Sequence, residues 1–302
     1  MSSFRQKRDE TVSVVIPVRN MAAQLRECLE SLNKAHPRPK EIIVVDDCSQ
    51  DNSAQVARKL GARTITLDRV QGANYCRNIG AAKARSSLLL FLDSDVVPER
   101  DIVERVTKRF TDSSLQAIVG VYAARHRHEN LASRYKNFWI RYSYLNRGSS
   151  IDWIFGAVSA IRKNAFQHHG GFDGTLFMQN SGGDLELGKR MAHAYFKIEF
   201  AREVEVEHQK YHTVRSLLHN DFERSRSLVE MALKLKQLTR SVRRGFVNIY
   251  TAFVVGTLLS LPMLLSAGLS LYLQESGRLF FALTVSYGLV AAPFVSSFVR
   301  LY

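Results

Sequence analysis

Cysteine is scarce in this chain of 302 residues, which has only Cys28, Cys48 and Cys76. Three cysteines are an odd number, and they have neither the spacing of a zinc site nor the density of a disulfide framework. This pattern fits a reducing compartment. Residues 1–10 are polar and lack the apolar region of a signal peptide.

Several sequence motifs are also absent. The chain has no Gly-x-Gly-x-x-Gly motif and no P-loop, which disfavours a dehydrogenase and a P-loop nucleotide hydrolase. It has no internal repeats and no low-complexity segments. Hydrophobic residues make up 46% and charged residues 23%, so disorder is excluded as the dominant state.

Charge is missing from two long stretches near the carboxyl end, residues 246–273 and 279–299. About 20 apolar residues cross the bilayer core as a helix. Because only residues 274–278 separate the stretches, we predict a transmembrane hairpin over 246–302. The alternatives are a pair of core helices in a soluble protein, a re-entrant hairpin, or a hairpin buried in a dimer.

Positive charge is in excess, with 42 Lys and Arg against 28 Asp and Glu, a net +14. Such an excess admits nucleic acid, a membrane surface or an anionic substrate as partner. Residues 210–244 hold nine basic and three acidic residues, and their last basic residues adjoin the first uncharged stretch. The positive-inside rule therefore predicts that this basic segment lies in the cytoplasm. With two membrane spans, both termini would then face the cytoplasm. Binding to nucleic acid is not expected, since no recognisable reading module is present.

An apolar stripe with basic residues around it predicts a helix over 215–242. This pattern fits a helix lying in an anionic bilayer interface. The alternative is a helix packed on the soluble domain, with its charges solvated.

Short β-branched runs alternate with helical patterns through the first half of the chain. This order predicts a parallel sheet covered by helices. The predicted strands are 11–16, 41–45, 63–66, 87–92, 115–121, 151–161 and 203–207. The predicted helices are 21–35, 51–60, 72–85, 98–110, 130–146 and 184–194.

Ligands of parallel sheets bind beyond the carboxyl ends of the strands. Asp93-Ser94-Asp95 follows the fourth predicted strand, and its two carboxylates can bind a hard cation such as Mg²⁺ or Mn²⁺ together with phosphate oxygens. The alternative is a turn whose acids cap the helix after Pro98.

Two further groups at this edge suit a nucleotide. Asp46 and Asp47 end the second strand and can hydrogen-bond a base or ribose, although capping of the next turn is the simpler role. Arg77 lies near a helix start, where a cation and backbone donors can meet a pyrophosphate.

Asp184 begins a predicted helix after two glycines. It can serve as a general base for an acceptor hydroxyl, or it can simply stabilise the helix start. Glu186 competes for the catalytic role. His208 follows a predicted strand and is either structural or a metal ligand, if the fold brings it to Asp95.

These motifs together resemble the family 2 glycosyltransferases of GT-A fold. The resemblance covers about residues 11–210, and its motifs appear in the family's order. They are Val14 to Asn20, Val44 to Ser49, Gly72 to Gly80, Phe91 to Asp95, Gly170 to Asp173, and Asp184.

The resemblance implies a Rossmann-like, mostly parallel sheet with helices on both faces, and transfer of a sugar from a nucleotide-sugar donor. By analogy, Asp184 is the catalytic base, and Asp93, Asp95 and His208 contact Mg²⁺ or Mn²⁺. The donor lies against Pro17, Val18, Asn20, Asp46, Asp47, Arg77, Asp93 and Ser94. Gly183 departs from the glutamate that many members have before the base.

We therefore predict an inverting glycosyltransferase of the inner or plasma membrane, with its catalytic domain on the cytoplasmic side. The domains would be 1–210 (catalytic), 211–245 (interfacial) and 246–302 (membrane hairpin). The donor would be UDP-linked, as is commonest in the family, and the acceptor a lipid-linked or saccharide hydroxyl. A Gln-x-x-Arg-Trp signature is absent, which favours single transfers. The alternatives are a nucleotidyltransferase and a non-catalytic nucleotide-sugar binding protein.

Overall fold

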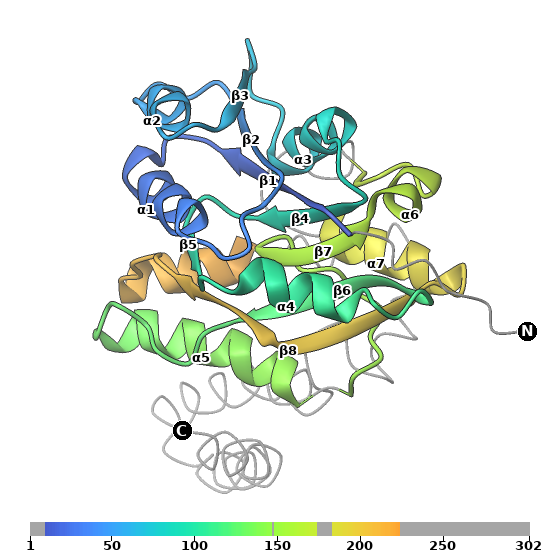
Figure 1. The fold of residues 1–302 in the computed structure, drawn as a ribbon. Coiled ribbons are helices and arrows are strands. Elements are labelled where there is room, and N and C mark those ends of the chain that lie inside the picture. Colours follow the sequence, from blue (N-terminus) through green and yellow to red (C-terminus); the bar gives the residue numbers. More distant parts are fainter. Residues whose placement is uncertain (1–9, 147, 174–182, 224–302) are drawn as a thin grey trace, which may run out of the picture. The chain divides into compact units, whose positions relative to one another are not determined.

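The computed structural model describes residues 10–146, 148–173 and 183–223, which belong to the first of two compact units, Met1–Leu228 (Figure 1). The predicted membrane hairpin and most of the predicted interfacial segment lie outside the described residues. Within the described residues, no helix has the length and apolar character needed to span a membrane.

Four parallel strands form the first half of the sheet, in the order β3-β2-β1-β4. They are β1 (Val12–Val18), β2 (Glu41–Asp46), β3 (Arg63–Thr66) and β4 (Leu88–Leu92). Every residue of β1 and of β4 is buried, as expected for strands covered on both faces. The connecting helices are α1 (Ala22–Asn33), α2 (Ser53–Lys59) and α3 (Ala73–Lys83).

The second half of the sheet is mixed. β7 (Val158–Arg162) runs antiparallel to both β4 and β6 (Leu115–Tyr122), and β8 (Lys197–His208) is parallel to β6 and antiparallel to β5 (Val96–Pro98). Its helices are α4 (Ile102–Arg109), α5 (Leu131–Leu145), α6 (Lys163–His168) and α7 (Gly183–His193). Figure 1 shows α1 and α4 in front of the sheet, with α3 and α7 behind it. The predicted helix-covered sheet is confirmed, but its parallel part is mainly the first half.

Several predicted boundaries differ from the structure. β8 begins at Lys197 instead of residue 203, and neither β5 nor α6 was predicted. Two other differences have a common cause. β7 spans residues 158–162, so only residues 158–161 of the predicted strand 151–161 pair in the sheet, although most of the residues before them are buried. The amide of Ile154 instead donates to the backbone oxygen of Asp184. The helix expected from Pro98 begins at Ile102, since Pro98 ends β5. In both places a short apolar run fitted more than one conformation.

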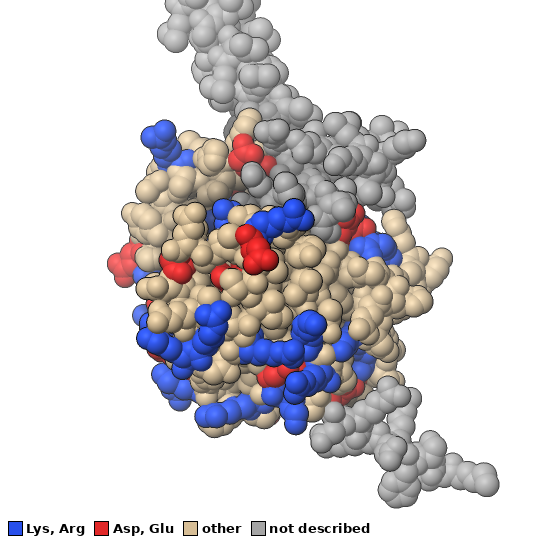
Figure 2. Space-filling view, turned by 90° about the horizontal axis from the view of Figure 1, so that it is seen from above, with Lys and Arg blue, Asp and Glu red and all other residues tan. Residues whose placement is uncertain are grey.

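Basic side chains gather along one side of the face shown in Figure 2. The exposed basic residues around the carboxyl ends of α2 and α3 and the start of β3 are Arg58, Lys59, Arg63, Lys83 and Arg85. Arg63 begins β3, so these residues lie at the amino ends of the parallel strands.

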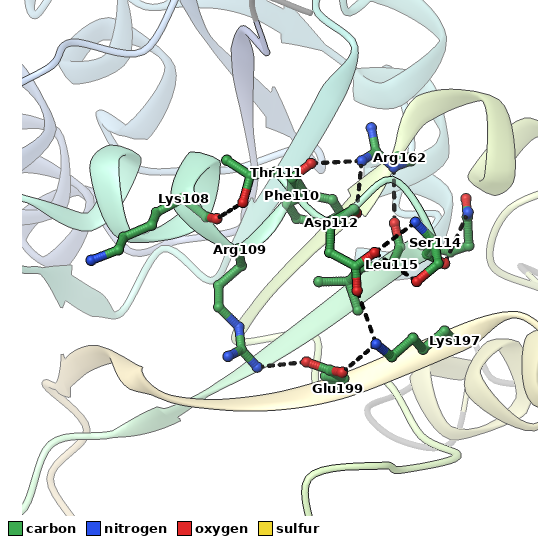
Figure 3. Close-up of polar contacts among 11 residues, drawn as sticks. Lys108, Arg109, Phe110, Thr111, Asp112, Ser114, Leu115, Arg162, Lys197 and Glu199 are labelled. Carbon is green, nitrogen blue, oxygen red and sulfur yellow. Dashed lines mark hydrogen bonds and ion pairs between the residues drawn. The ribbon is translucent and has the colours of Figure 1, made fainter. Parts of the chain in front are cut away.

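Arg162 braces the same end of the sheet (Figure 3). Its guanidinium donates to the backbone oxygens of Leu115 and Phe110, each at 2.8 Å, and pairs with Glu10 at 2.5 Å. It also lies over the Phe110 ring. Arg162 therefore satisfies carbonyl groups just beyond α4, where the helix leaves them without partners.

Candidate active site

The carboxyl ends of β1, β2 and β4 meet at one edge of the sheet, as the sequence predicts. Val18 pairs with Asp46 across β1 and β2, and the Asp47 amide donates to the Val18 backbone oxygen at 2.8 Å. Pro17 and Val18 are buried within β1. Asp93, Ser94 and Asp95 follow β4 directly.

The two adjacent acids after β2 differ in their contacts. Asp47 accepts the amides of Gln71 at 2.7 Å and Gly72 at 2.9 Å. Because these two amides lie directly before α3, Asp47 holds the start of that helix in place. Gly72 has φ 89°, a conformation that favours glycine. Asp46 is 1% exposed, and its Oδ1 has no hydrogen-bond partner in the described part of the chain. Because such burial is costly, Asp46 is the acid of this pair with an oxygen left for a ligand.

Asn20 joins the loops that follow β1 and β2. Its side-chain Oδ1 accepts a hydrogen bond from the Gln50 backbone amide at 2.7 Å, and its backbone amide donates to Ser49 Oγ at 3.0 Å. Its φ of 53° is one that asparagine tolerates better than most residues. Ser94 is buried and its hydroxyl donates to Met21 Sδ. Both residues therefore shape the edge of the sheet through contacts within the protein.

Arg77 occupies the centre of the site. It is 6% exposed, and its Nη2 donates to Asp93 Oδ1 at 2.5 Å while its Nη1 donates to Asn74 Oδ1 at 3.0 Å. The guanidinium lies 5.6 Å from the centre of the Phe172 ring. These contacts hold the positively charged guanidinium of Arg77 at the carboxyl edge of the sheet, where it can bind a phosphate.

The acids here are crowded. Burial raises the pKa of Asp93 above its ordinary value; Arg77 opposes this shift, and the charges of Asp95 and Asp184 add to it. A third of the Asp93 side chain is still exposed. A bound cation would relieve the repulsion among these carboxylates.

His208 lies beside Asp95, as the metal-ligand hypothesis requires. His208 is the last residue of β8 and pairs with Val96, which places its Nε2 3.6 Å from Asp95 Oδ2. Burial alone would raise the pKa of Asp95, but the hydrogen bond and charge of His208, with the charge of Lys210, lower it overall. The His208 ring stacks on Tyr122, with ring centres 4.3 Å apart.

Asp95 and His208 are therefore two adjacent side chains that can bind a metal ion. Among the residues that the structure describes, no group of three His, Cys, Asp or Glu is arranged to hold a metal ion. Mg²⁺ in nucleotide sites commonly takes one or two carboxylates, waters and substrate phosphates. The pair of Asp95 and His208 fits a cation that is completed by a diphosphate.

Asp184 lies in the first turn of α7, facing the buried segment before β7. Its Oδ2 accepts the Gly156 amide at 3.1 Å, and its Oδ1 accepts the Leu185 amide at 2.9 Å. Glu186, its competitor, instead receives two hydrogen bonds from Arg190, at 2.7 and 2.6 Å. A carboxylate paired with a guanidinium is a weak base, so the geometry favours Asp184.

The sequence motifs did not assign roles to three residues that organise this site. Asn78 pairs with both backbone groups of Phe172, at 2.7 and 2.9 Å, and so holds the turn at 170–173. Gly156 lies under Arg77, since a Cβ there would be 2.7 Å from Nη2. Asn74 contacts Arg77 as described above. Asn74 and Asn78 lie in the motif from Gly72 to Gly80, and Gly156 lies in the predicted strand 151–161, so the sequence pointed to these segments but not to the contacts of the three residues.

The chain is similar in sequence to known glycosyltransferases. Residues 13–170, more than half of the chain, match Glycosyl transferase family 2. Glycosyltransferase AglE of Haloferax volcanii is 28% identical over 204 residues, which cover 64% of this chain and 65% of AglE. The pre-mycofactocin glycosyltransferase of Mycobacterium tuberculosis is 29% identical over 201 residues, covering 63% of this chain and 40% of that protein. The matched part thus spans less than two thirds of these relatives.

Solved structures share the fold. The mannosyltransferase PcManGT from Pyrobaculum calidifontis, in complex with GDP-Man and Mn²⁺, has a TM-score of 0.55 and 15% identity, over 94% of this chain and 86% of PcManGT. S. aureus TarS 1-349, in complex with UDP-GlcNAc, has a TM-score of 0.53 and 18% identity, over 67% of this chain and 59% of that one. The family match over more than half of the chain shows that this chain belongs to glycosyl transferase family 2.

Proposed function

We propose that this glycosyltransferase moves a sugar from a nucleotide-sugar donor, UDP-linked in the first instance, to a hydroxyl of a lipid-linked or saccharide acceptor, with inversion. The observation that carries the proposal is the convergence of three groups at one sheet edge. Arg77 pairs with Asp93, Asp95 lies beside His208, and Asp184 lies at the start of α7. The family match favours this enzyme over a nucleotidyltransferase or a non-catalytic binding protein.

Donor binding would use the carboxyl ends of the strands. Asp46, with its unpartnered buried oxygen, is suited to a base or ribose hydroxyl, together with Pro17, Val18, Asn20 and Asp47 around it. Structural neighbours support this class of donor, since they were solved with UDP-GlcNAc or GDP-Man.

A divalent cation, Mg²⁺ or Mn²⁺, would be held by Asp95 and His208, with Asp93 close by. Two neighbours were solved with Mn²⁺, PcManGT and GalNAc-T7. When bound, the cation would neutralise the charge that builds on the leaving diphosphate. Arg77 contributes a fixed positive charge to the same diphosphate.

The reaction that fits these residues is a single displacement. Asp184 takes the proton of the acceptor hydroxyl while the hydroxyl oxygen attacks the anomeric carbon of the donor sugar. The bond from that carbon to the diphosphate oxygen breaks on the opposite face. Inversion follows from one attack on the face away from the leaving group. To test this step, the full chain is incubated with a nucleotide sugar that it uses as a substrate. The coupling constant of the anomeric proton in the product then gives the configuration. Retained configuration would contradict it.

Membrane attachment is part of the proposal. Its support is the uncharged stretches at 246–273 and 279–299 and the basic run before them. Residues 214–223 are helical, as predicted, and Val214, Leu218 and Phe222 on this helix are exposed. Exposed apolar side chains at this spacing support contact with a bilayer interface.

The proposed topology places the short loop at 274–278 outside the cell and both termini in the cytoplasm. In a Cys48→Ser background, a cysteine placed at Ser276 should react with a membrane-impermeant maleimide in intact cells, and one at Ser2 should react only after lysis. The reverse labelling would contradict the orientation.

A further inference from the structure

Asn74 lies between the arginine and the carboxylate of the site. Its Oδ1 accepts a hydrogen bond from Arg77 Nη1 at 3.0 Å. The other end of the same amide lies against Gly183, the residue before Asp184. A Cβ on Gly183 would overlap Asn74 Nδ2 and lie 3.0 Å from its Cγ. The Asn74 amide therefore fills the space in which a side chain at position 183 would begin.

A second contact joins the same two groups. Gly156 donates its amide to Asp184 Oδ2 at 3.1 Å, and it packs under Arg77, where a Cβ would be 2.9 Å from Cζ. The backbone before Gly156 also follows α7, because the Ile154 amide donates to the Asp184 backbone oxygen at 3.3 Å. Two separate sets of contacts thus connect Arg77 to Asp184. One runs through Asn74 and Gly183, and the other runs through Gly156.

Helix capping does not explain Asn74. The N-cap of α3 is Gly72, and it has no side-chain capping bond. The amides of Gln71 and Gly72 are instead satisfied by Asp47. The Asn74 side chain is turned to Arg77 and α7, which leaves it free for a role between them.

We propose that Asn74 is a positioning residue that sets the separation between Arg77 and Asp184, and that residue 183 is glycine because Asn74 occupies its side-chain space. The catalytic part of this inference rests on the role proposed above for Asp184. The structural part does not, because it concerns the packing of α3 against α7.

Hydrogen exchange tests the packing without any substrate. The full chain in detergent would carry Gly183→Ala, Asn74→Ala or both, and exchange would be followed in peptides that contain the amides of Ile154 and Gly156. Gly183→Ala should speed their exchange about tenfold or more, because the added Cβ would overlap the Asn74 amide, which Arg77 holds in place, so that α7 shifts away from these donors. Adding Asn74→Ala should restore exchange to within about threefold of the Asn74→Ala single variant.

The matched control is Gly148→Ala, since a Cβ at Gly148 would have no atom within 4 Å. It should leave exchange unchanged. If Gly183→Ala does not fold, recovery of the folded chain by the added Asn74→Ala supports the inference. Unchanged exchange in Gly183→Ala, or a double variant no better than Gly183→Ala, would overturn it.

Kinetics distinguish positioning from a structural role. With a nucleotide sugar that the wild type uses, Asn74→Ala should lower kcat about tenfold and change the donor KM by less than about threefold, at an unchanged Tm. A raised donor KM with unchanged kcat would assign Asn74 to donor binding and overturn the link to Asp184. If the wild type transfers no sugar, the proposed function fails, and the exchange result still decides the packing.

Discussion

The acidic residues of the site differ in the hydrogen-bond donors and cations with which they are already paired. Asp47 accepts two backbone amides that start α3, Asp93 is paired with Arg77, and Glu186 is paired with Arg190. Within the described residues, the hydrogen bonds that Asp184 accepts come from backbone amides, and Asp95 lies beside an imidazole. Proton transfer suits Asp184, because protonating it breaks no ion pair.

Asp184→Asn should therefore lower kcat by about 10²- to 10⁴-fold, the usual contribution of a general base, while the chain stays folded. Glu186→Gln is the matched control on the same helix, and it should keep most of the activity because it removes only the pair with Arg190. Steady-state transfer by both purified variants, with Tm recorded for each, checks this. Equal or greater loss in Glu186→Gln would reassign the base.

Some of these residues could be predicted from the sequence, since Asp46, Asp47, Asp93 and Asp95 directly follow apolar strands and parallel strands end at one edge. The approach of His208 to Asp95 was only a hypothesis, because it depends on how β8 pairs with β5. The roles of Asn74 and Gly156 could not be predicted. They arise from contacts between segments far apart in the chain, for which no local pattern exists.

Among the elements, the end of the sheet opposite the site depends on Arg162 of β7. Its side chain is buried against β6 and the end of α4 (Figure 3). Its charge is matched by Glu10, which is also mostly buried. Removing one member of such a pair leaves the other charge and several carbonyl groups without partners.

Arg162→Met should destabilise the domain by about 3 kcal/mol, within the range for breaking a buried ion pair. The expected result is a Tm several degrees lower in a thermal melt, with the donor KM unchanged. Lys108→Met is the control, because Lys108 is exposed on α4, and its effect should stay within about 0.5 kcal/mol. Equal melting of the two variants would show that the Arg162 network is not a brace.

The elements β1 to β4 and α1 to α3 were predictable because β1, β2 and β4 are short apolar runs ended by a turn signal, and β3 is a short β-branched run between two helical patterns. The segment before β7 was not, because its apolar residues are buried without pairing as a strand. Its amides are taken by Asp184, and α7 packs so closely that a Cβ on Gly188 would overlap the backbone of Trp153. The sequence pattern predicted a strand over 151–161, and only its last part is one.

For the whole molecule, the net charge of +14 separates into regions with different roles. The exposed basic residues of α2, β3 and α3 lie at the amino ends of the strands, away from the site. The charge of Arg77 acts on Asp93, and the charges of His208 and Lys210 act on Asp95. The basic run at 234–244 adjoins the uncharged stretches and supports the proposed membrane contact.

The most direct test of the account is a thermal melt of the full chain in detergent, with a panel of nucleotide sugars and with Mn²⁺ or Mg²⁺. A ligand that binds the native state raises Tm by mass action. We predict that one nucleotide sugar raises Tm only when the cation is present, and that Asp95→Ala and His208→Ala each abolish the shift. No shift with any donor, or a full shift in both variants, would contradict the account.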